Sequence, residues 1–159
     1  MGKLLVNAAF LKGLHVSMVQ QYSPYVRGGW VSCNLVISDQ PIDSPVANEF
    51  DTVVVFDPVS YGEFTPKLKK GGYLFSNNSL IHQDGAPNAE KSFSVPVNDI
   101  ATELGNLKLI NMVMLGSYCK HRGWLTTDDV IACLQKTLPV RRHKLIPMNE
   151  KALKRGESL

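Results

Sequence analysis

The sequence predicts an α/β domain in which helices cover both faces of a mostly parallel or mixed central sheet, a three-layer α/β/α arrangement. Strand-like and helix-like segments alternate along the chain, which is the pattern of layered α/β folds. The run Thr-Val-Val-Val-Phe at 52–56 lacks polar alternation, which is typical of a strand covered on both faces. The 159 residues, 44% of them hydrophobic, suffice for one core, so a single domain over residues 1–159 is expected.

The first elements are predicted from periodicity and from glycine. Residues 3–12 carry apolar side chains at helical spacing, and Gly13 follows as the expected end of that helix. Residues 15–19 alternate as a strand does, and apolar side chains at every second position predict another strand over 30–38. The segment 22–29 contains proline and two glycines and is predicted to be the loop between these strands.

The middle of the chain is predicted as two strands with polar connections. The strand at 52–56 ends at an Asp-Pro pair, and residues 65–70 are predicted as a short polar connection that a Gly-Gly pair breaks. Residues 73–76, Tyr-Leu-Phe-Ser, are predicted as the next short strand. The composition of residues 82–91 predicts a surface loop.

The last third of the chain is predicted as helices. Asn98 is expected to cap a helix that ends at Gly105. Residues 110–121 form a helix that is apolar on nearly every side, so it is buried or also meets a partner. Thr126 is expected to cap the next helix, which has acidic residues in its first turn, and a last helix is predicted around 149–155.

The N-terminus does not fit a complete doubly wound domain. The chain begins with a helix that feeds a strand, whereas such a helix normally follows a strand and crosses over to the next one. Absence of a first strand leaves the edges of neighbouring strands unpaired. We therefore expect that the N-terminus is incomplete, or that a partner supplies the missing edge.

Composition excludes several classes of function. A net charge of +3 with 19% charged residues is too mild for a nucleic-acid-binding protein. The longest apolar stretches, such as Val53–Phe56 and Met112–Leu115, are far shorter than the roughly 20 residues of a membrane span, so no membrane association is expected. No secretory signal is recognised at the start, and a cytoplasmic location is expected.

The three cysteines are isolated from one another in sequence. Without a CxxC pair, zinc or iron–sulfur ligation by this chain is not expected, and a reduced cytosolic protein is the plain interpretation. Cys33 and Cys133 are expected to fill buried, small apolar positions.

Four segments carry a resemblance to a known family, in matching order and spacing. They are Tyr22–Gly29 (Tyr-Ser-Pro-Tyr-Val-Arg-Gly-Gly), Val36–Ile42 (Val-Ile-Ser-Asp-Gln-Pro-Ile), Asn111–Gly116 (Asn-Met-Val-Met-Leu-Gly) and Asn149–Gly156 (Asn-Glu-Lys-Ala-Leu-Lys-Arg-Gly). These resemble the Y-G-P-E-x-R-G-G, V-I-S-D-x-P-I, N-M-V-x-L-G and N-x-x-A-x-x-x-G motifs of the γ subunits, or γ domains, of 2-oxoacid:ferredoxin oxidoreductases. The resemblance covers nearly the whole chain.

The chain departs from the family pattern at two places. Family members usually begin with a strand and a G-x-G-G-Q-G loop before the first helix, and only Met1-Gly2 stands there. A nucleotide- or coenzyme-binding role of that loop is therefore in doubt. In the Tyr22–Gly29 motif Ser23 replaces a glycine and Tyr25 replaces a glutamate, so no carboxylate role is carried over to that position.

The resemblance implies a role within a larger enzyme. The complete enzymes of the family convert a 2-oxoacid and coenzyme A into an acyl-CoA and carbon dioxide, with ferredoxin as electron acceptor. Thiamine diphosphate, Mg²⁺ and the iron–sulfur clusters are implied for the complex, and this chain alone is expected to bind no cofactor and to hold no metal. The implied partners are the α, β and ferredoxin-like δ subunits, and the segment Ser76–Ile81 most resembles the 2-oxoglutarate branch.

The loop between the first two strands holds the main candidate contacts. Arg27 is the best single candidate, because a guanidinium fork on a constrained loop suits a carboxylate or a phosphate. Its partner is the 2-oxoacid, coenzyme A or a neighbouring subunit, and the alternative is a structural arginine that binds loop carbonyls. Tyr22, Gly28 and Gly29 belong to the same candidate contact, where the glycines allow a positive φ or the close approach of another chain, and a plain turn is the alternative for the two glycines.

Three more candidates lie elsewhere in the sequence. Asn77 and Ser79 follow a strand end, where α/β sheets commonly bind ligands, although an asparagine-rich turn explains them as well. Asn111 opens the buried helix, where packing against the core or a partner is the expected role. No catalytic residue is predicted.

Two other functions remain open from the sequence. A self-standing nucleotide- or coenzyme A-binding module needs a phosphate-binding loop, and none is recognised. A truncated, inactive relic would explain the missing first strand.

Overall fold

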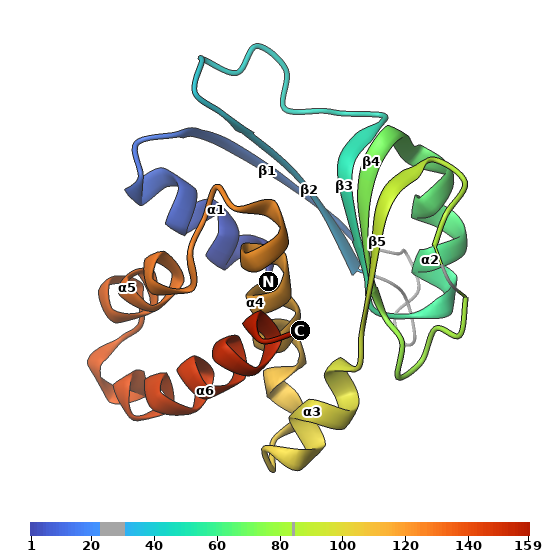
Figure 1. Cartoon of the computed structure of the whole chain (residues 1–159). Helices are drawn as coiled ribbons and strands as arrows, with labels where there is room; N and C mark the ends of the chain where they lie inside the picture. The colour runs from blue at the N-terminus through green and yellow to red at the C-terminus, as the bar shows by residue number, and fades with distance from the viewer. Residues whose placement is uncertain (23–30, 84) are drawn as a thin grey trace.

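The structure is a computed structural model that describes residues 1–22, 31–83 and 85–159. Over these residues the strands are β1 (His15–Tyr22), β2 (Val31–Ser38), β3 (Phe50–Val55), β4 (Leu68–Asn77) and β5 (Ala89–Val95). The α-helices are α1 (Gly2–Leu11), α2 (Pro58–Phe64), α3 (Val97–Glu103), α4 (Ile110–Arg122), α5 (Thr127–Thr137) and α6 (Ile146–Glu157). Short 3₁₀ turns occupy Thr65–Lys67, Leu107–Leu109 and Val140–Leu145. Figure 1 shows the whole chain.

The strands form two sheets. β1 and β2 are an antiparallel pair in which His15 lies opposite Ser38 and Tyr22 lies opposite Val31. The other three strands are parallel, in the order β3-β4-β5. The predicted α/β class is confirmed, but the expected central sheet is divided, because among the described strands none hydrogen-bonds to both β2 and β3.

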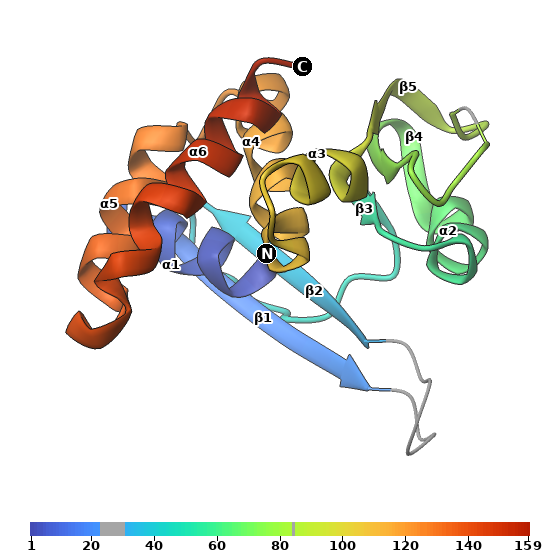
Figure 2. The same ribbon diagram turned by 90° about the horizontal axis from the view of Figure 1, so that it is seen from below.

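Helices cover the sheets from two sides. In Figures 1 and 2, α1, α4, α5 and α6 form one layer, and α2 lies on the far side of the three-stranded sheet. The side chains of β3 divide between these layers: Val53 and Val55 are buried in the small apolar cluster near α2, while Val54 packs against the large core. The prediction that this strand is covered on both faces is confirmed.

Two glycines allow α4 and α6 to meet backbone to backbone. A β-carbon on Gly116 would collide with the carbonyl oxygen of Leu153, and one on Gly156 would collide with the carbonyl oxygen of Val113. These glycines end two of the motifs on which the family resemblance rests. The two motifs are therefore the two sides of one close helix crossing. The predicted burial of α4 is confirmed by its unbroken buried stretch from Met112 to Cys119.

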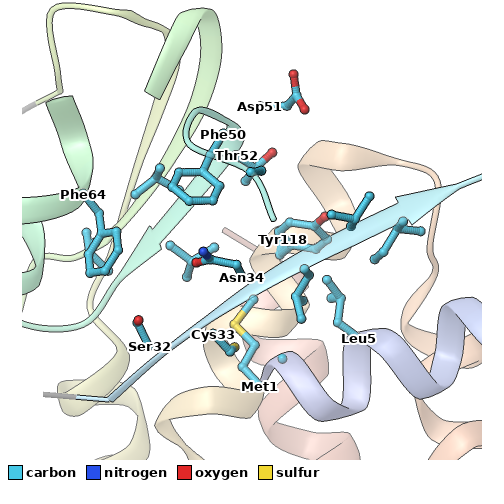
Figure 3. A pocket seen from close by; sticks show the side chains of 18 of the residues that line it. Met1, Leu5, Ser32, Cys33, Asn34, Phe50, Asp51, Thr52, Phe64 and Tyr118 are labelled. Carbon is cyan, nitrogen blue, oxygen red and sulfur yellow. The ribbon is translucent and has the colours of Figure 1, made fainter. Parts of the chain in front are cut away.

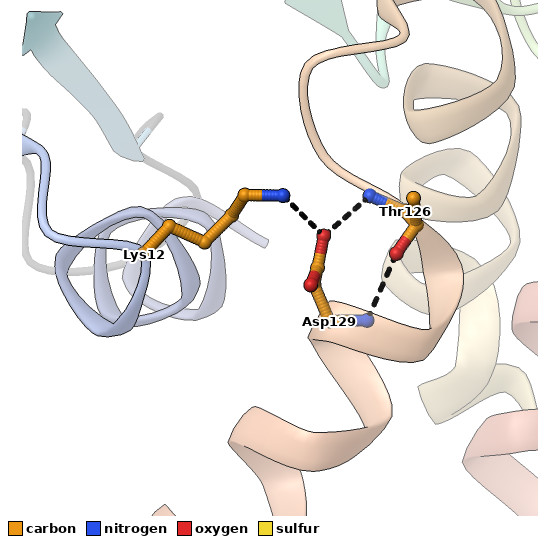
Figure 4. A network of polar contacts seen from close by, with 3 residues as sticks. All are labelled: Lys12, Thr126 and Asp129. Atoms are coloured by element: carbon orange, nitrogen blue, oxygen red, sulfur yellow. Dashed lines mark hydrogen bonds and ion pairs between the residues drawn. The ribbon is translucent and has the colours of Figure 1, made fainter. Parts of the chain in front are cut away.

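The start of α5 is held by a capping box and by a link to α1. Thr126 accepts a hydrogen bond from the Asp129 amide (3.1 Å), and Asp129 accepts one from the Thr126 amide (2.9 Å). The Lys12 ammonium lies 2.7 Å from the same carboxylate, so the end of α1 is tied to the start of α5 (Figure 4). The predicted cap at Thr126 is confirmed.

The predicted polar segments at 65–70 and 82–91 were partly wrong, because both contain the beginning of a strand. β4 begins at Leu68, its pairing with β5 has a register shift at Gly72–Tyr73, and Lys69 pairs with Asp51 at 2.9 Å. β5 begins at Ala89 and exposes most of its residues up to Ser94. β5 lies at the edge of its sheet, where polar residues are common and apolar alternation is weak.

The helices on either side of this region also differ from the prediction. α2 was missed, because its start signals were interpreted only as the end of a strand: Asp57 accepts a hydrogen bond from the Ser60 amide (2.9 Å), and Pro58 opens the helix. The residue at the cap position of α3 is Pro96, so the assignment of Asn98 as its cap was wrong. Gly105, at φ 76°, follows that helix as expected.

Candidate functional site

The first group of candidate residues lies at the carboxyl ends of the parallel strands. Asn77 is the last residue of β4 and is 1% exposed. Its amide nitrogen donates to the carbonyl oxygen of Phe56 (3.0 Å), just after β3, and to the Oδ1 of Asn98 (2.9 Å), at the start of α3. The side chain therefore holds two strand ends and the beginning of a helix in fixed positions.

Ser79 continues this network toward the surface. Its amide donates to the Oδ1 of Asn77 (3.2 Å), which forms a turn closed by the asparagine side chain. Its hydroxyl donates to the Asp99 carboxylate (3.0 Å), and the Asp99 amide approaches the same hydroxyl oxygen at 3.4 Å. Asp99 was not singled out from the sequence, since nothing local indicates that residues twenty positions apart meet at this edge.

The geometry gives Asn77 a structural role and leaves Ser79 closer to solvent. Both amide hydrogens of Asn77 have internal acceptors, so it has no donor left for a ligand. Ser79 is half-buried and lies next to the exposed carboxylate of Asp99. Contact of either residue with a ligand or a partner stays a prediction.

The other candidates are not part of this network. Tyr22 ends β1 with 66% of its surface exposed, and its hydroxyl donates to the Oε1 of Gln20 (2.8 Å). Asn111 lies half-buried in the first turn of α4. Arg27, Gly28 and Gly29 lie outside the described residues.

A cleft of about 800 Å³ separates the two sheets. Every residue of β2 and every residue of β3 contributes to its walls. Figure 3 shows Met1, Leu5 and Cys33 on one side and Phe50 and Phe64 on the other. The cleft is therefore bounded along its length by two strands, and its lining combines apolar side chains with polar and charged ones such as Asp51, Lys69 and Arg122.

The helix layer contributes one end of the cleft through α4 and the residues after it. Tyr118 is buried, and its hydroxyl accepts a hydrogen bond from the Trp124 indole at 3.1 Å. Desolvation raises the pKa of Tyr118, because the charged phenolate is disfavoured away from water. Arg122 reaches from the end of α4 to lie 4.2 Å from the centre of the Tyr73 ring, a cation–π contact with β4.

The thiols differ in environment. Cys133 is fully buried, as predicted, but Cys33 is exposed in the cleft, so the expectation for Cys33 was wrong. The strand that holds Cys33 has no described neighbour on its cleft side, which the sequence pattern of the strand alone does not reveal. Cys119 is buried in α4, and burial, with the nearby carboxylates of Glu157 and Asp129, raises its pKa to about 12.

In the three described stretches, no helix is both long enough and apolar enough to cross a bilayer. Nor do any three His, Cys, Asp or Glu side chains in these stretches gather so that they could hold a metal ion.

Relatives of known designation align with most of this chain. The ketoisovalerate oxidoreductase subunit VorA of Methanothermobacter thermautotrophicus is 34% identical over 73% of the chain, a segment that spans only 24% of VorA. The 2-oxoglutarate synthase subunit KorC of Methanocaldococcus jannaschii is 27% identical over 83% of the chain and 72% of KorC.

Solved structures share the fold. The γ subunit of a keto/oxoacid ferredoxin oxidoreductase from Geobacter sulfurreducens superposes with a TM-score of 0.78 at 22% identity, covering 99% of this chain and 87% of that one. The 2-oxoglutarate:ferredoxin oxidoreductase of Magnetococcus marinus gives 0.82 at 18% identity, over 99% of this chain and 27% of that one. The family model described as pyruvate ferredoxin/flavodoxin oxidoreductase matches residues 1–159. The chain therefore belongs to the pyruvate ferredoxin/flavodoxin oxidoreductase family.

Proposed function

We propose that this chain is the γ-type subunit of a 2-oxoacid:ferredoxin oxidoreductase and acts only within the assembled complex. The observation that carries the proposal is the family match over residues 1–159. It is supported by the extent of the fold match, since 99% of the chain superposes on a subunit described as γ.

The substrate of the complex is a 2-oxoacid, and we propose 2-oxoglutarate as the first candidate. The segment Ser76–Ile81 resembles the 2-oxoglutarate branch, and the KorC relatives align with 83–87% of this chain. Ketoisovalerate is the second candidate, because VorA has the higher identity, 34% against 27%. Both candidates are carboxylates, which suits an arginine such as Arg27 at the contact.

The chemistry of decarboxylation belongs, in this proposal, to other subunits. Thiamine diphosphate with Mg²⁺ supplies the electron sink for the keto carbon, and iron–sulfur clusters carry the electrons to ferredoxin. The α, β and ferredoxin-like δ subunits are the proposed partners, and the complex is proposed to be cytoplasmic. The described part of this chain positions its neighbours through the rigid strand ends around Asn77 and through the cleft between the sheets.

Reconstitution of the complex tests the proposal. The chain is expressed with candidate thiamine-binding and ferredoxin-like subunits, and CoA-dependent reduction of ferredoxin is followed with 2-oxoglutarate, ketoisovalerate and pyruvate. We expect turnover only when this chain is present, with 2-oxoglutarate preferred. Full activity of the other subunits without it contradicts the proposal.

The isolated chain supplies the matching control. We expect no oxidation of any 2-oxoacid by the chain alone and no calorimetric signal with micromolar coenzyme A. Micromolar binding of coenzyme A to the isolated chain would instead support a self-standing coenzyme-binding module.

A further inference from the structure

The start of α6 carries apolar side chains that face solvent. Leu145 is 44% exposed and Met148 is 42% exposed, and they lie three positions apart where a 3₁₀ turn continues into α6, so they share one side of the chain. The amide nitrogen of Asn106 lies 3.8 Å from the Met148 sulfur, which brings the turn after α3 against the start of α6. Leu107, in that turn, is 59% exposed. Leu107, Leu145 and Met148 therefore form one exposed apolar strip.

The two segments that carry this strip are held together at a second point. Glu103, at the end of α3, pairs with Arg155 of α6 at 3.0 Å. Figures 1 and 2 show α6 beside the end of α3. The strip is therefore fixed by tertiary contacts in the free chain, and a partner that binds it has little backbone to order.

Unpaired positive charge lies on the same two segments. The exposed cations are Lys108, Arg141, Arg142, Lys144 and Lys151. In the described part of the chain, none of their side chains forms an ion pair. The carboxylates nearby are already engaged, since Glu103 pairs with Arg155 and Glu150 pairs with Lys154 at 2.6 Å. The apolar strip is therefore flanked by positive charge that this side of the molecule does not balance.

The lysines lie on either side of the apolar side chains. Lys144 lies four residues before Met148 and Lys151 lies three residues after it, which are the spacings of one helical face. Lys108 directly follows Leu107. An apolar centre with a charged rim is the usual anatomy of a protein–protein interface.

We propose that the surface formed by Leu107, Lys108, Lys144, Leu145, Met148 and Lys151 binds an acidic surface of another protein chain. The partner surface presents Asp or Glu side chains around an apolar contact, because that arrangement complements both the lysines and the strip. The proposal rests on the proposed function for the existence of a neighbouring chain. It adds which side of this chain is covered and the chemistry of what covers it.

Two other occupants fit this surface less well. The apolar face of α6, with Ile146, Ala152 and Leu153, is buried inside the protein, so the helix has no such face to insert into a bilayer. A symmetric second copy would bring Lys144 and Lys151 against the same cations of its partner. Like charges placed together in an interface oppose association.

Carbodiimide crosslinking of the assembled complex tests the proposal. The reagent activates a carboxylate, a lysine amine in contact attacks the activated carbonyl, and an amide forms as the urea leaves. We expect amides that join Lys108, Lys144 or Lys151 to Asp or Glu of another subunit, located by mass spectrometry. Amides from these lysines to carboxylates of this chain alone, or no crosslink from them in an assembled complex, overturn the proposal.

Charge reversal measures the contribution of the lysines. The double variant Lys144→Glu, Lys151→Glu should raise the Kd for the other subunits at least about tenfold at low ionic strength. The increase should shrink in 0.5 M salt, at a Debye length of roughly 4 Å. The matched control is Lys70→Glu, Lys91→Glu, which changes the net charge equally at exposed positions of β4 and β5. Equal effects of the two double variants overturn the proposal.

A peptide probe keeps this inference separate from the proposed function. If the chain joins no complex, the proposed function fails, and the isolated chain is crosslinked with a synthetic helical peptide that carries glutamates on both sides of a leucine stripe. We expect Lys108, Lys144 and Lys151 to couple at least about fivefold more than Lys70 and Lys91, because complementary charge concentrates the peptide there. Even coupling over these lysines overturns the inference.

Two further measurements identify a different occupant. The chain is sedimented with vesicles of phosphatidylglycerol and phosphatidylcholine, and its mass is followed with concentration by analytical ultracentrifugation. We expect no binding to vesicles and no dimer that depends on this surface. Vesicle binding or dimerisation that Lys144→Glu, Lys151→Glu abolishes would assign the surface to a membrane or to a second copy, and either result overturns the proposal.

Discussion

Substitution of Gly156 by alanine tests the packing of the helix layer. A β-carbon at this position would lie 2.8 Å from the carbonyl carbon of Val113 and 3.1 Å from the amide nitrogen of Ser117, and it would overlap the Val113 oxygen. Carbon contacts normally begin near 3.5 Å, so α4 and α6 must move apart. Because the obstacle is backbone, no rotamer change can relieve the collision.

The magnitude follows from two opposing terms. Overpacking of a tight core costs about 1–3 kcal/mol, and the upper end applies where backbone must move. Alanine gains about 1 kcal/mol over glycine in a helix. We therefore expect Gly156→Ala to lower the free energy of unfolding by about 2 kcal/mol, which in a chain of this length lowers Tm by about 4–8 °C.

Urea unfolding of Gly156→Ala and of a matched control measures the difference. Gly62 lies exposed in α2, and a β-carbon there meets nothing within 4 Å, so Gly62→Ala should be neutral or stabilising by up to about 1 kcal/mol. Gly116→Ala should resemble Gly156→Ala, and the double variant should lose less than the sum, because both glycines serve one crossing. If Gly156→Ala is as stable as Gly62→Ala, the inferred backbone contact is wrong.

Three further predictions concern the thiols, the start of α5 and the loop after β1. Short treatment with iodoacetamide should label Cys33 before Cys119 and Cys133, because Cys119 is buried with its pKa raised to about 12; equal labelling by mass spectrometry contradicts this assignment. Hydrogen bonds from Lys12, and next from the Thr126 amide, hold the pKa of Asp129 below its usual 3.8. The ionised carboxylate therefore stabilises the fold fully above pH 3.8, and this stabilisation is lost as the pH falls through the lowered pKa. Asp129→Asn should therefore lower the free energy of unfolding by about 1 kcal/mol at pH 7 and by less in strong acid. If urea unfolding shows a difference between the variant and the wild-type chain that does not change with pH, this account is wrong. In the reconstituted complex, Arg27→Ala should raise the Michaelis constant for the 2-oxoacid or coenzyme A at least about tenfold, the loss of one charge-assisted contact, whereas unchanged kinetics would leave only a structural role.

Several elements could be predicted because their signals are local. The cap at Thr126 needs only the residues up to Asp129, and the glycine after α1 needs only the residues it follows. The unbroken apolar character of α4 indicated its burial without knowledge of its neighbours. Signals of this kind depend on residues within one or two helical turns of each other, so the sequence alone reveals them.

The site could be predicted only in part. The sequence placed Asn77 and Ser79 at a strand end, but the contacts with Phe56 and Asn98 join residues 21 positions apart in each case. The polar residues at the starts of β4 and β5 resembled loops. β5 is an edge strand and the start of β4 is exposed, so neither segment has the apolar alternation that marks a strand.

The sequence by itself determined the α/β class, most of the helices and the family resemblance, since periodicity, caps and motifs are written in consecutive residues. Tertiary structure alone decided that β2 and β3 belong to different sheets, that Cys33 is exposed between them, and that Gly116 and Gly156 meet across one helix crossing. The physical reason is that pairing of distant backbone groups depends on which segments meet in space, and residues far apart in the chain decide that together.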